Sequence, residues 1–418
     1  MFDELFGGPG VDDDAWLTAM LDAERALASA QARAGVIPAG AAASIARACS
    51  AGDFDAAVLG RQAVSSGNPV VPLVTQLRSH VPAEVSRYVH FGATSQDIMD
   101  TAASLVAVRA LAPLLADVDT TASRCALLAD EHRDTLMIAR TLTQHALPTV
   151  FGLKCAGWLV ALDEAAAQLR RVEPAAQLGG AAGTLAVFRD LRVPDLFAAE
   201  LGLAAPVIPW HTDRTRFASL AAALGVLAGV LGKIALDVTL MAQTEVAELS
   251  EATGGGSSAM PHKQNPVRAV LITAAVRQVP GLVSTMLAAM VQEHERAAGG
   301  WHAEWETLSS LLRLVGGAAA RTRDLLTGLR VDRERMRANV DLTGGLVMTE
   351  ALAGRLGRDL VTELSRSGRP LREALRGHLP DDEIDVLMNP ANHLGSAEEM
   401  IDRALRRDRP WQTAPTGT

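Results

Sequence analysis

A long, almost uncharged segment in the middle of the chain limits the folds that this sequence can adopt. Between Phe217 and Met241 only Lys233 and Asp237 are charged, and leucines recur at helical spacing. We expect one nearly unbroken helix from Phe217 to Leu249. A helix that is apolar on most sides must be buried on most sides. The segment therefore predicts the centre of a helical bundle, with bundle partners that include other subunits of a homotetramer.

The composition of the whole chain predicts an all-α fold. Of its 418 residues 49% are hydrophobic and only 4% are aromatic, which favours helices that pack through alanine and leucine. We expect further long helices from Pro266 to about Arg296 and from about Glu304 to Gly328. Proline and glycine positions predict an N-terminal helical domain over residues 1–93, a central long-helix bundle over 94–340 and a small C-terminal helical domain over 341–418.

Charge and composition argue against several classes of partner. The net charge is −9 and the basic residues are scattered, so we expect neither nucleic acid nor a membrane surface as a partner. The apolar windows are interrupted, no signal peptide is recognisable, and the three cysteines form no Cys-x-x-Cys pair. We therefore expect a cytoplasmic protein without a membrane span. Metal-ligand spacings and a dinucleotide fingerprint are absent from the sequence, so we expect no metal and no cofactor.

The stretch from Gly254 to Arg268 reads Gly-Gly-Gly-Ser-Ser-Ala-Met-Pro-His-Lys-Gln-Asn-Pro-Val-Arg. Three glycines and two hydroxyls predict a mobile loop that carries polar chemistry, although a plain linker between helices is the alternative. Asn265 suits an N-cap, and Pro266 suits the first helical position. The positive end of that helix would meet the ammonium group of Lys263, which predicts an anion site.

The pattern Gly-Ser-Ser-x-Met-Pro-x-Lys-x-Asn-Pro in this stretch resembles the signature loop of the fumarase/aspartase superfamily. The resemblance implies an all-α subunit of three domains and a serine that acts as a base. We expect Ser257 to transfer the proton and Lys263 to stabilise the charge that develops. Ser258 and Asn265 are the implied contacts to a substrate carboxylate. Gln264 stands where adenylosuccinate lyases and many cycloisomerases have arginine, so that contact is not expected here.

A second motif, His-Phe-Gly-Ala-Thr-Ser-Gln-Asp, begins at His90. Thr94 or Ser95 can cap the helix that runs towards Asp130, and a helix start also presents free N–H groups to an anion. The string is similar to the superfamily's Gly-x-Thr-Ser-x-Asp motif, in which threonine and serine hold a substrate carboxylate. We therefore expect Thr94 and Ser95 to contact the substrate, with capping alone as the alternative.

A third string, Arg-Thr-Leu-Thr-Gln-His, starts at Arg140. Adenylosuccinate and argininosuccinate lyases have Thr-His-Gly-Gln here, and their histidine assists the leaving group. Leu142 replaces that histidine and cannot donate a proton. The resemblance implies substrate contacts from Thr141 and Gln144. His145 is either a further site residue or a histidine on a helix surface or interface.

The string Trp-His-Thr-Asp-Arg over residues 210–214 places His211 and Arg214 in an apolar neighbourhood. They are either substrate contacts or satisfied structural groups. This string, Leu142 and the segment 292–308 resemble bacterial 3-carboxy-cis,cis-muconate cycloisomerases more than other branches. The superfamily also has a substrate-binding arginine or serine near the chain start, but residues 3–10 contain neither. That contact is therefore missing or supplied elsewhere.

The resemblance implies an enzyme for a small polycarboxylate, which removes a proton beside a carboxylate and expels a group from the next carbon. In the cycloisomerase branch, which belongs to protocatechuate degradation, 3-carboxy-cis,cis-muconate and 4-carboxymuconolactone interconvert. The leaving group is then a carboxylate, which departs without a proton and so agrees with Leu142. A nitrosuccinate lyase fits equally well, an adenylosuccinate lyase less well, and an inactive scaffold paralogue is the alternative outside enzymes.

Overall fold

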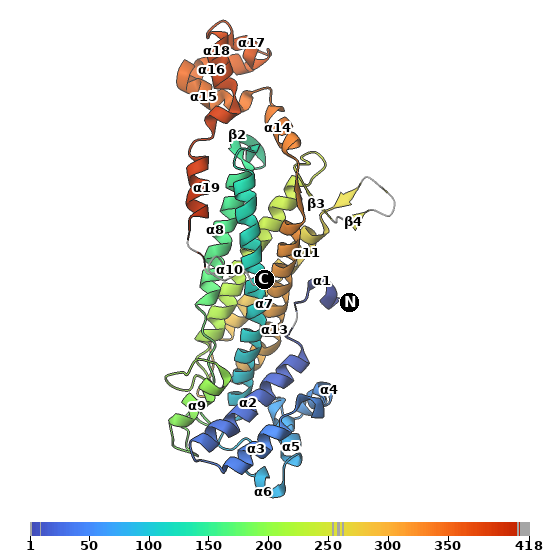
Figure 1. Cartoon of the computed structure of the whole chain (residues 1–418), viewed down its shortest axis with the longest axis vertical. Coiled ribbons are helices and arrows are strands. Elements are labelled where there is room, and N and C mark those ends of the chain that lie inside the picture. The colour runs from blue at the N-terminus through green and yellow to red at the C-terminus, as the bar shows by residue number, and fades with distance from the viewer. Residues whose placement is uncertain are drawn as a thin grey trace, which may run out of the picture. The chain divides into compact units, whose positions relative to one another are not determined.

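We analysed a computed structural model of the chain, which describes residues 2–8, 10–252, 255–256, 260, 263–407 and 409. Helices dominate the ribbon (Figure 1), and the strands of the described part pair only in twos, so the all-α expectation is confirmed. The chain divides into two compact units. Unit 1 comprises Met1–Ala116, Ala165–Gly229 and Ala274–Ala320, and unit 2 comprises Asp117–Glu164, Val230–Thr273 and Arg321–Thr418. The three-domain division at residues 93 and 340 stays a prediction.

Short helices surround one longer helix at the start of unit 1. The longer helix, α2, is capped by the Asp12 carboxylate, which accepts a hydrogen bond from the Ala15 N–H at 2.9 Å. The helical elements of this region are α1 (Phe2–Phe6), α2 (Asp13–Arg33), α3 (Ala39–Ala48), η1 (Ala51–Asp53), α4 (Ala56–Ala63), α5 (Val70–Ser79) and α6 (Ala83–Ser86). Later in the chain α9 (Arg192–Leu201) also belongs to unit 1.

Five helices contain the residues at which the two units divide. They are α7 (Ser95–Glu131), α8 (Phe151–Arg170), α10 (Thr215–Met241), α11 (Val267–Val276) and α13 (Gly300–Thr327). In unit 2, α8 lies against α10, because the Trp158 indole donates to Asp237 at 2.9 Å. Asp237 also pairs with Lys233 and with Lys154. The two charges in the apolar run of α10 therefore satisfy each other.

Two of the predicted long helices are shorter than expected. Helix α10 ends at Met241 instead of Leu249, since Ala247 takes a left-handed φ of 52° and the chain then forms strand β3 (Leu249–Glu251). The expected helix from Pro266 to Arg296 is divided into α11 and α12 (Val279–Ala288). Its proline, Pro280, stands in the first turn of α12, where a missing N–H costs no hydrogen bond. The third predicted long helix, from about Glu304 to Gly328, is confirmed by α13.

Among the described residues, the strands form three two-stranded antiparallel sheets in unit 2. They pair β1 (Leu136–Thr141) with β2 (Gln144–Val150), β3 with β6 (Leu329–Val331), and β4 (Gly255–Gly256) with β5 (Gln264–Asn265). His145 therefore lies on a strand, and the expectation of a helix-surface position is wrong. The turn between β1 and β2 consists of Leu142 and Thr143, with φ of 50° and 65°. Two left-handed residues in succession are the signature of a tight hairpin turn.

The C-terminal helices of unit 2 share a hydrophobic cluster with the hairpin, which includes Ile138, Val340, Leu352 and Ile384. The elements are α14 (Arg333–Asp341), η2 (Leu346–Met348), α15 (Thr349–Leu356), α16 (Arg358–Arg366), α17 (Leu371–Leu375), α18 (Asp381–Met388), η3 (Pro390–His393) and α19 (Ala397–Leu405). Packing of Ile138 in this cluster fixes the middle of the β1–β2 hairpin within the unit.

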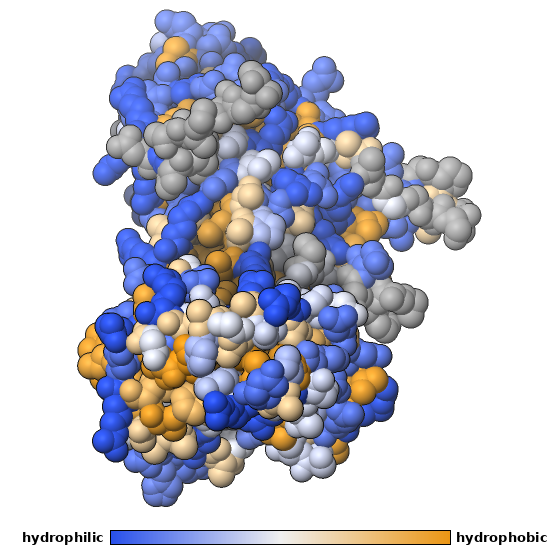
Figure 2. All heavy atoms as spheres, turned by 60° about the horizontal axis from the view of Figure 1, so that its bottom comes forward, coloured by the Kyte–Doolittle hydropathy of each residue, from blue (hydrophilic) through white to orange (hydrophobic). Residues whose placement is uncertain are grey.

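Three helical segments are long and apolar enough to cross a membrane by length and composition: Ser95–Glu131, Thr215–Met241 and Val267–Ala288. Of their most apolar stretches, 72%, 50% and 22% are buried within the chain. The last two leave large apolar side chains exposed, namely Val226, Leu236, Leu240, Val267, Val270 and Leu287. Figure 2 shows that hydrophobic residues, in orange, reach the surface in patches. The absence of a membrane span stays a prediction.

Candidate functional site

The start of α7, in unit 1, carries Thr94 and Ser95 on a fixed backbone. The Asp97 carboxylate is fully buried and accepts the Thr94 N–H at 2.9 Å, which closes the first turn of the helix. Asp97 also accepts the N–H groups of Gly179 and Gly180, at 3.0 and 2.9 Å. The predicted Thr-Ser pair therefore stands at a helix start beside the glycine-rich turn, with the first N–H donor already taken by Asp97.

The loop before Thr94 is held by further polar contacts in unit 1. His90 has a left-handed φ of 59°, and its Nδ1 lies 2.5 Å from Oε1 of the buried Glu24. Burial alone would lower the pKa of His90, but the Glu24 carboxylate outweighs it and the pKa is raised. Gln31 donates to the carbonyl of Phe91 at 2.6 Å. At Gly92 a Cβ atom would come within 2.4 Å of an aromatic ring, so only glycine fits.

His211 is bound to the same carboxylate that caps α7. Its Nε2 lies 2.7 Å from Asp97 Oδ1, and the residue is 5% exposed. The backbone around it is fixed as well, since the Trp210 N–H donates to Gln177 at 3.0 Å and the His211 carbonyl accepts from Gln96 at 2.7 Å. The structure thus brings His211 and Thr94 together through Asp97. A direct contact between His211 and the substrate stays a prediction.

Arg214 is surrounded by carboxylates. It is 2% exposed, donates to both oxygens of Asp100 at 2.8 and 2.9 Å, and donates to Glu304 at 2.6 Å. Burial opposes the charge of Arg214, but Asp100 and Glu304 raise its pKa above the ordinary value. Burial also raises the pKa of Glu304, against the opposing effect of Arg214. The guanidinium of Arg214 is thus engaged in structural ion pairs with Asp100 and Glu304. Its role as a substrate contact stays a prediction.

In unit 2, Thr141 and Gln144 are directly paired at the tip of the β1–β2 hairpin, and both are exposed. Directly paired residues of an antiparallel ladder project on the same side of the hairpin. The structure therefore brings these two predicted contacts together. Leu142, in the turn between them, is 95% exposed. His145 is half-buried, and burial followed by the nearby Arg140 charge lowers its pKa.

Sequence reasoning missed the ion pair that anchors this hairpin. Arg140 donates to both oxygens of Glu248, at 2.9 and 2.7 Å, and Glu248 is 0% exposed. Asn339 donates to the same carboxylate at 2.8 Å. Such a bidentate, buried pair fixes the hairpin next to its tip, in orientation as well as position. The partners are far apart in the sequence, and Glu248 lies among other acidic and polar residues, so no local signal marked the pair.

The signature loop is described at both of its ends, whereas Ser257 and Ser258 lie outside the described residues. Asn265 belongs to β5, opposite Gly255, and its side chain donates to the Gly255 carbonyl at 3.2 Å. Helix α11 begins at Val267, so the predicted N-cap role of Asn265 is wrong. The amide is used to close the neck of the loop instead.

The start of α11 already holds an anion from the chain itself. Glu251 is 5% exposed, and its two oxygens accept the N–H groups of Arg268 at 3.2 Å and of Ala269 at 3.1 Å. The helix start therefore holds an anion, as its dipole favours, but that anion is Glu251, and an anion site for a substrate stays a prediction. These two N–H groups are therefore occupied by the chain itself.

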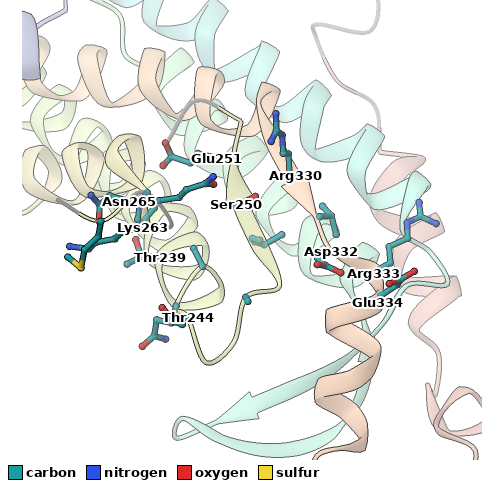
Figure 3. A pocket seen from close by; sticks show the side chains of 18 residues that line it. Thr239, Thr244, Ser250, Glu251, Lys263, Asn265, Arg330, Asp332, Arg333 and Glu334 are labelled. Atoms are coloured by element: carbon teal, nitrogen blue, oxygen red, sulfur yellow. The ribbon is translucent and has the colours of Figure 1, made fainter. Parts of the chain in front are cut away.

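A hollow of about 1140 Å³ in unit 2 opens beside the neck of the loop (Figure 3). Its polar lining comes from the end of α10, from β3, β5 and β6, and from the start of α14. The labelled lining residues are Thr239, Thr244, Ser250, Glu251, Lys263, Asn265, Arg330, Asp332, Arg333 and Glu334. Lys263 is exposed, and the acidic residues of the lining, Glu251, Asp332 and Glu334, form no ion pair with it among the described residues. The hollow therefore offers an ammonium group to a small anionic ligand.

The described residues contain no group of three or more His, Cys, Asp or Glu side chains placed to hold a metal ion. The two deeply buried cysteines, Cys125 and Cys155, are free thiols whose pKa is raised by burial. Half-buried Cys49 has its pKa raised to about 12, by burial first and by Glu24 second. The thiols are therefore protonated and belong to the packing rather than to the site.

Comparison with known proteins identifies the family. A family profile described as lyase matches residues 11–281. The 3-carboxy-cis,cis-muconate cycloisomerase of Bradyrhizobium diazoefficiens is 47% identical over 423 residues, with 94% of each chain covered. The nitrosuccinate lyase of Streptomyces davaonensis is 45% identical over 431 residues, with 94% of this chain and 91% of that enzyme covered.

A solved structure supports the same assignment. The 3-carboxy-cis,cis-muconate lactonizing enzyme from Pseudomonas putida superimposes with a TM-score of 0.91 at 41% identity. The superposition covers 97% of this chain and 98% of that one, so the likeness extends over the whole fold. The chain belongs to the lyase family of the fumarase/aspartase superfamily.

Proposed function

We propose that the protein is a cycloisomerase that interconverts 3-carboxy-cis,cis-muconate and 4-carboxymuconolactone in the degradation of aromatic compounds. Relatives with that activity in their names match nearly the whole chain. The structural observation that carries the proposal is Leu142, which is 95% exposed at the hairpin tip between Thr141 and Gln144. A tip without an acid suits a leaving group that needs no proton, and a carboxylate is such a group.

The chemistry follows from the charge that has to be stabilised. In the lactone-forming direction a carboxylate oxygen adds to a double bond, and the neighbouring carbon takes a proton. In the reverse direction a base removes that proton, an aci-carboxylate with two negative charges forms, and the ring carboxylate leaves. We assign the proton transfer to Ser257 and the stabilisation of the extra charge to Lys263, which lines the hollow beside the loop.

The remaining assignments follow the positions of the side chains. Thr94 and Ser95 stand at the start of α7, and Thr141 and Gln144 stand at the hairpin tip, so these pairs can each hold a carboxylate. Ser258 and Asn265 complete the set around the loop. His211 and Arg214 are assigned to the same site, where their bonds to Asp97 and Asp100 support the α7 start.

A nitrosuccinate lyase is the second candidate. A relative of that name is 45% identical to this chain, and nitrite leaves without a proton as a carboxylate does. Adenylosuccinate lyase is less favoured because Leu142 replaces the histidine that assists its leaving group. An inactive scaffold is disfavoured by the presence of Ser257, Lys263 and Asn265 together.

We also infer a cytoplasmic homotetramer with sites shared between subunits and without a cofactor, nucleic acid or membrane partner. The exposed apolar side chains of α10, α11 and α12 support the assembly, since burial against other copies would remove them from water. The predicted contacts at the α7 start and at the hairpin tip belong to different units of the chain.

The test is turnover by the purified protein, followed by ultraviolet absorbance, with carboxymuconate, nitrosuccinate and adenylosuccinate as separate substrates. Loss of the conjugated diene of carboxymuconate, with the lactone identified by NMR, is the expected result. Ser257→Ala protein prepared in the same way is the matched blank. Turnover of nitrosuccinate alone would move the assignment to the second candidate, and no turnover of any substrate would favour a scaffold.

A further inference from the structure

Arg296 lies in the turn between α12 and α13 of unit 1, close to the predicted substrate contacts. The turn has its own internal support, because the Glu293 carboxylate accepts the Ala298 N–H at 3.1 Å and Ala297 is 8% exposed. Gly299 takes a φ of 116°, which a residue with a side chain rarely adopts. The guanidinium of Arg296 is therefore carried by a backbone of defined shape.

The guanidinium reaches the start of α7. Its Nη1 donates to the Thr94 hydroxyl oxygen at 2.7 Å, and its Nη2 donates to the Ala181 carbonyl at 3.2 Å. Because Thr94 accepts this bond, its own hydroxyl proton stays available to another acceptor. Arg296 thus orients Thr94 as a donor towards whatever lies beside it.

Arg296 differs from Arg214 in the charges that surround it. Arg214 is neutralised by Asp100 and Glu304, whereas no described carboxylate lies at ion-pairing distance from Arg296. Asp97 is the acid next to Thr94, and its oxygens are occupied by His211 and backbone N–H groups. A half-buried guanidinium with spare donors is suited to bind a carboxylate through two parallel hydrogen bonds.

We propose that Arg296 and Thr94 together bind one carboxylate of the substrate. Arg296 then supplies the cation that residues 3–10 and Gln264 do not provide. The inference rests on the proposed function in one respect, namely that the ligand is a polycarboxylate. Arg296 acts in binding rather than in proton transfer, so its removal weakens the ground-state complex as much as the transition state.

Binding can be measured apart from turnover. The probe is tricarballylate, a saturated tricarboxylate, titrated by calorimetry into the wild-type protein, Arg296→Gln and Arg296→Lys. A lost hydrogen bond between charged groups corresponds to about a 10- to 100-fold weaker affinity. We expect that loss in Arg296→Gln and a smaller one in Arg296→Lys, which keeps the charge but not the planar fork. The matched control is Arg192→Gln, an exposed arginine of unit 1 paired with Asp190, and it should bind as the wild type does.

Two further measurements separate binding from a purely structural role. Melting temperature should be nearly unchanged in Arg296→Gln, and KM for carboxymuconate should rise more than kcat falls. In a double-mutant cycle with Thr94→Val, the two losses should be less than additive, because both residues hold the same carboxylate. Tricarballylate affinity within threefold of wild type in Arg296→Gln, strict additivity, or no binding by the wild type would overturn the inference. Turnover of carboxymuconate by the wild type is scored separately and tests the proposed function alone.

Discussion

Ser257 and Lys263 belong to one loop but carry different parts of the proposed chemistry. If Ser257 moves the proton, Ser257→Ala should lower kcat by about 10²- to 10⁴-fold and leave KM nearly unchanged. Lys263→Ala should lower kcat and raise KM, because its charge holds the ground-state carboxylate and the charge that develops. Steady-state kinetics on carboxymuconate distinguish the two, with Ser65→Ala in an exposed turn as the control. A Ser257→Ala protein with normal kcat would remove Ser257 from the mechanism.

Leu142 allows a second prediction about the leaving group. A carboxylate gains nothing from an acid as it departs, so Leu142→His should not increase kcat for lactone chemistry. Because Leu142 is 95% exposed, the substitution has little packing to disturb, and Leu142→Ala controls for the loss of the side chain. A large increase in kcat with the histidine alone would mean that proton donation limits the reaction, and the argument for a weakly basic leaving group would be lost.

Some individual site residues could be placed from the sequence and others could not. Thr94 and Ser95 were predictable at a helix start because capping chemistry is local, and α7 does begin at Ser95. The environments of His211 and Arg214 were not predictable. Their partners Asp97 and Glu304 are 114 and 90 residues away, and only the fold brings these charges together.

At the scale of elements, helices with local signals were predicted better than turns. Helix α13 was predictable from its apolar spacing. The β1–β2 hairpin was missed because Leu142 and Thr143 occupy left-handed positions that usually call for glycine or asparagine. The end of α10 was placed too late because residues 242–249 contain neither proline nor glycine to stop a helix, while the partner strand β6 that draws Leu249 into a sheet lies far along the chain.

Glu251 gives a prediction at this scale. Its carboxylate caps α11, so Glu251→Ala should remove about 1–2 kcal/mol of stability and, for a chain of 418 residues, lower the melting temperature by about 1–2 °C. Glu251→Gln keeps a hydrogen-bond acceptor but loses the charge, so its melting temperature should lie between those of the wild type and Glu251→Ala. Calorimetric melting checks the order, with the exposed Glu398→Ala in the first turn of α19 as the control. Equal melting temperatures for all four proteins would show that the cap does not stabilise α11.

For the whole molecule, the exposed apolar side chains of α10 to α12 predict a homotetramer. Light scattering should give about four times the chain mass of 43.9 kDa at micromolar concentration. If each site takes residues from several chains, mixing inactive Ser257→Ala with inactive Gln144→Ala protein should restore part of the activity through hybrid sites. A stable monomer, or no recovery after verified subunit exchange, would contradict these two inferences.

The central claim is that carboxymuconate is the preferred substrate, and a competition assay tests it most directly. Carboxymuconate and nitrosuccinate are supplied to the wild-type protein at equal concentration, and the early product ratio reports the ratio of their kcat/KM values. The account predicts that 4-carboxymuconolactone forms in large excess over the products of nitrite elimination, with neither formed by Ser257→Ala. Nitrite released faster than the lactone would contradict it.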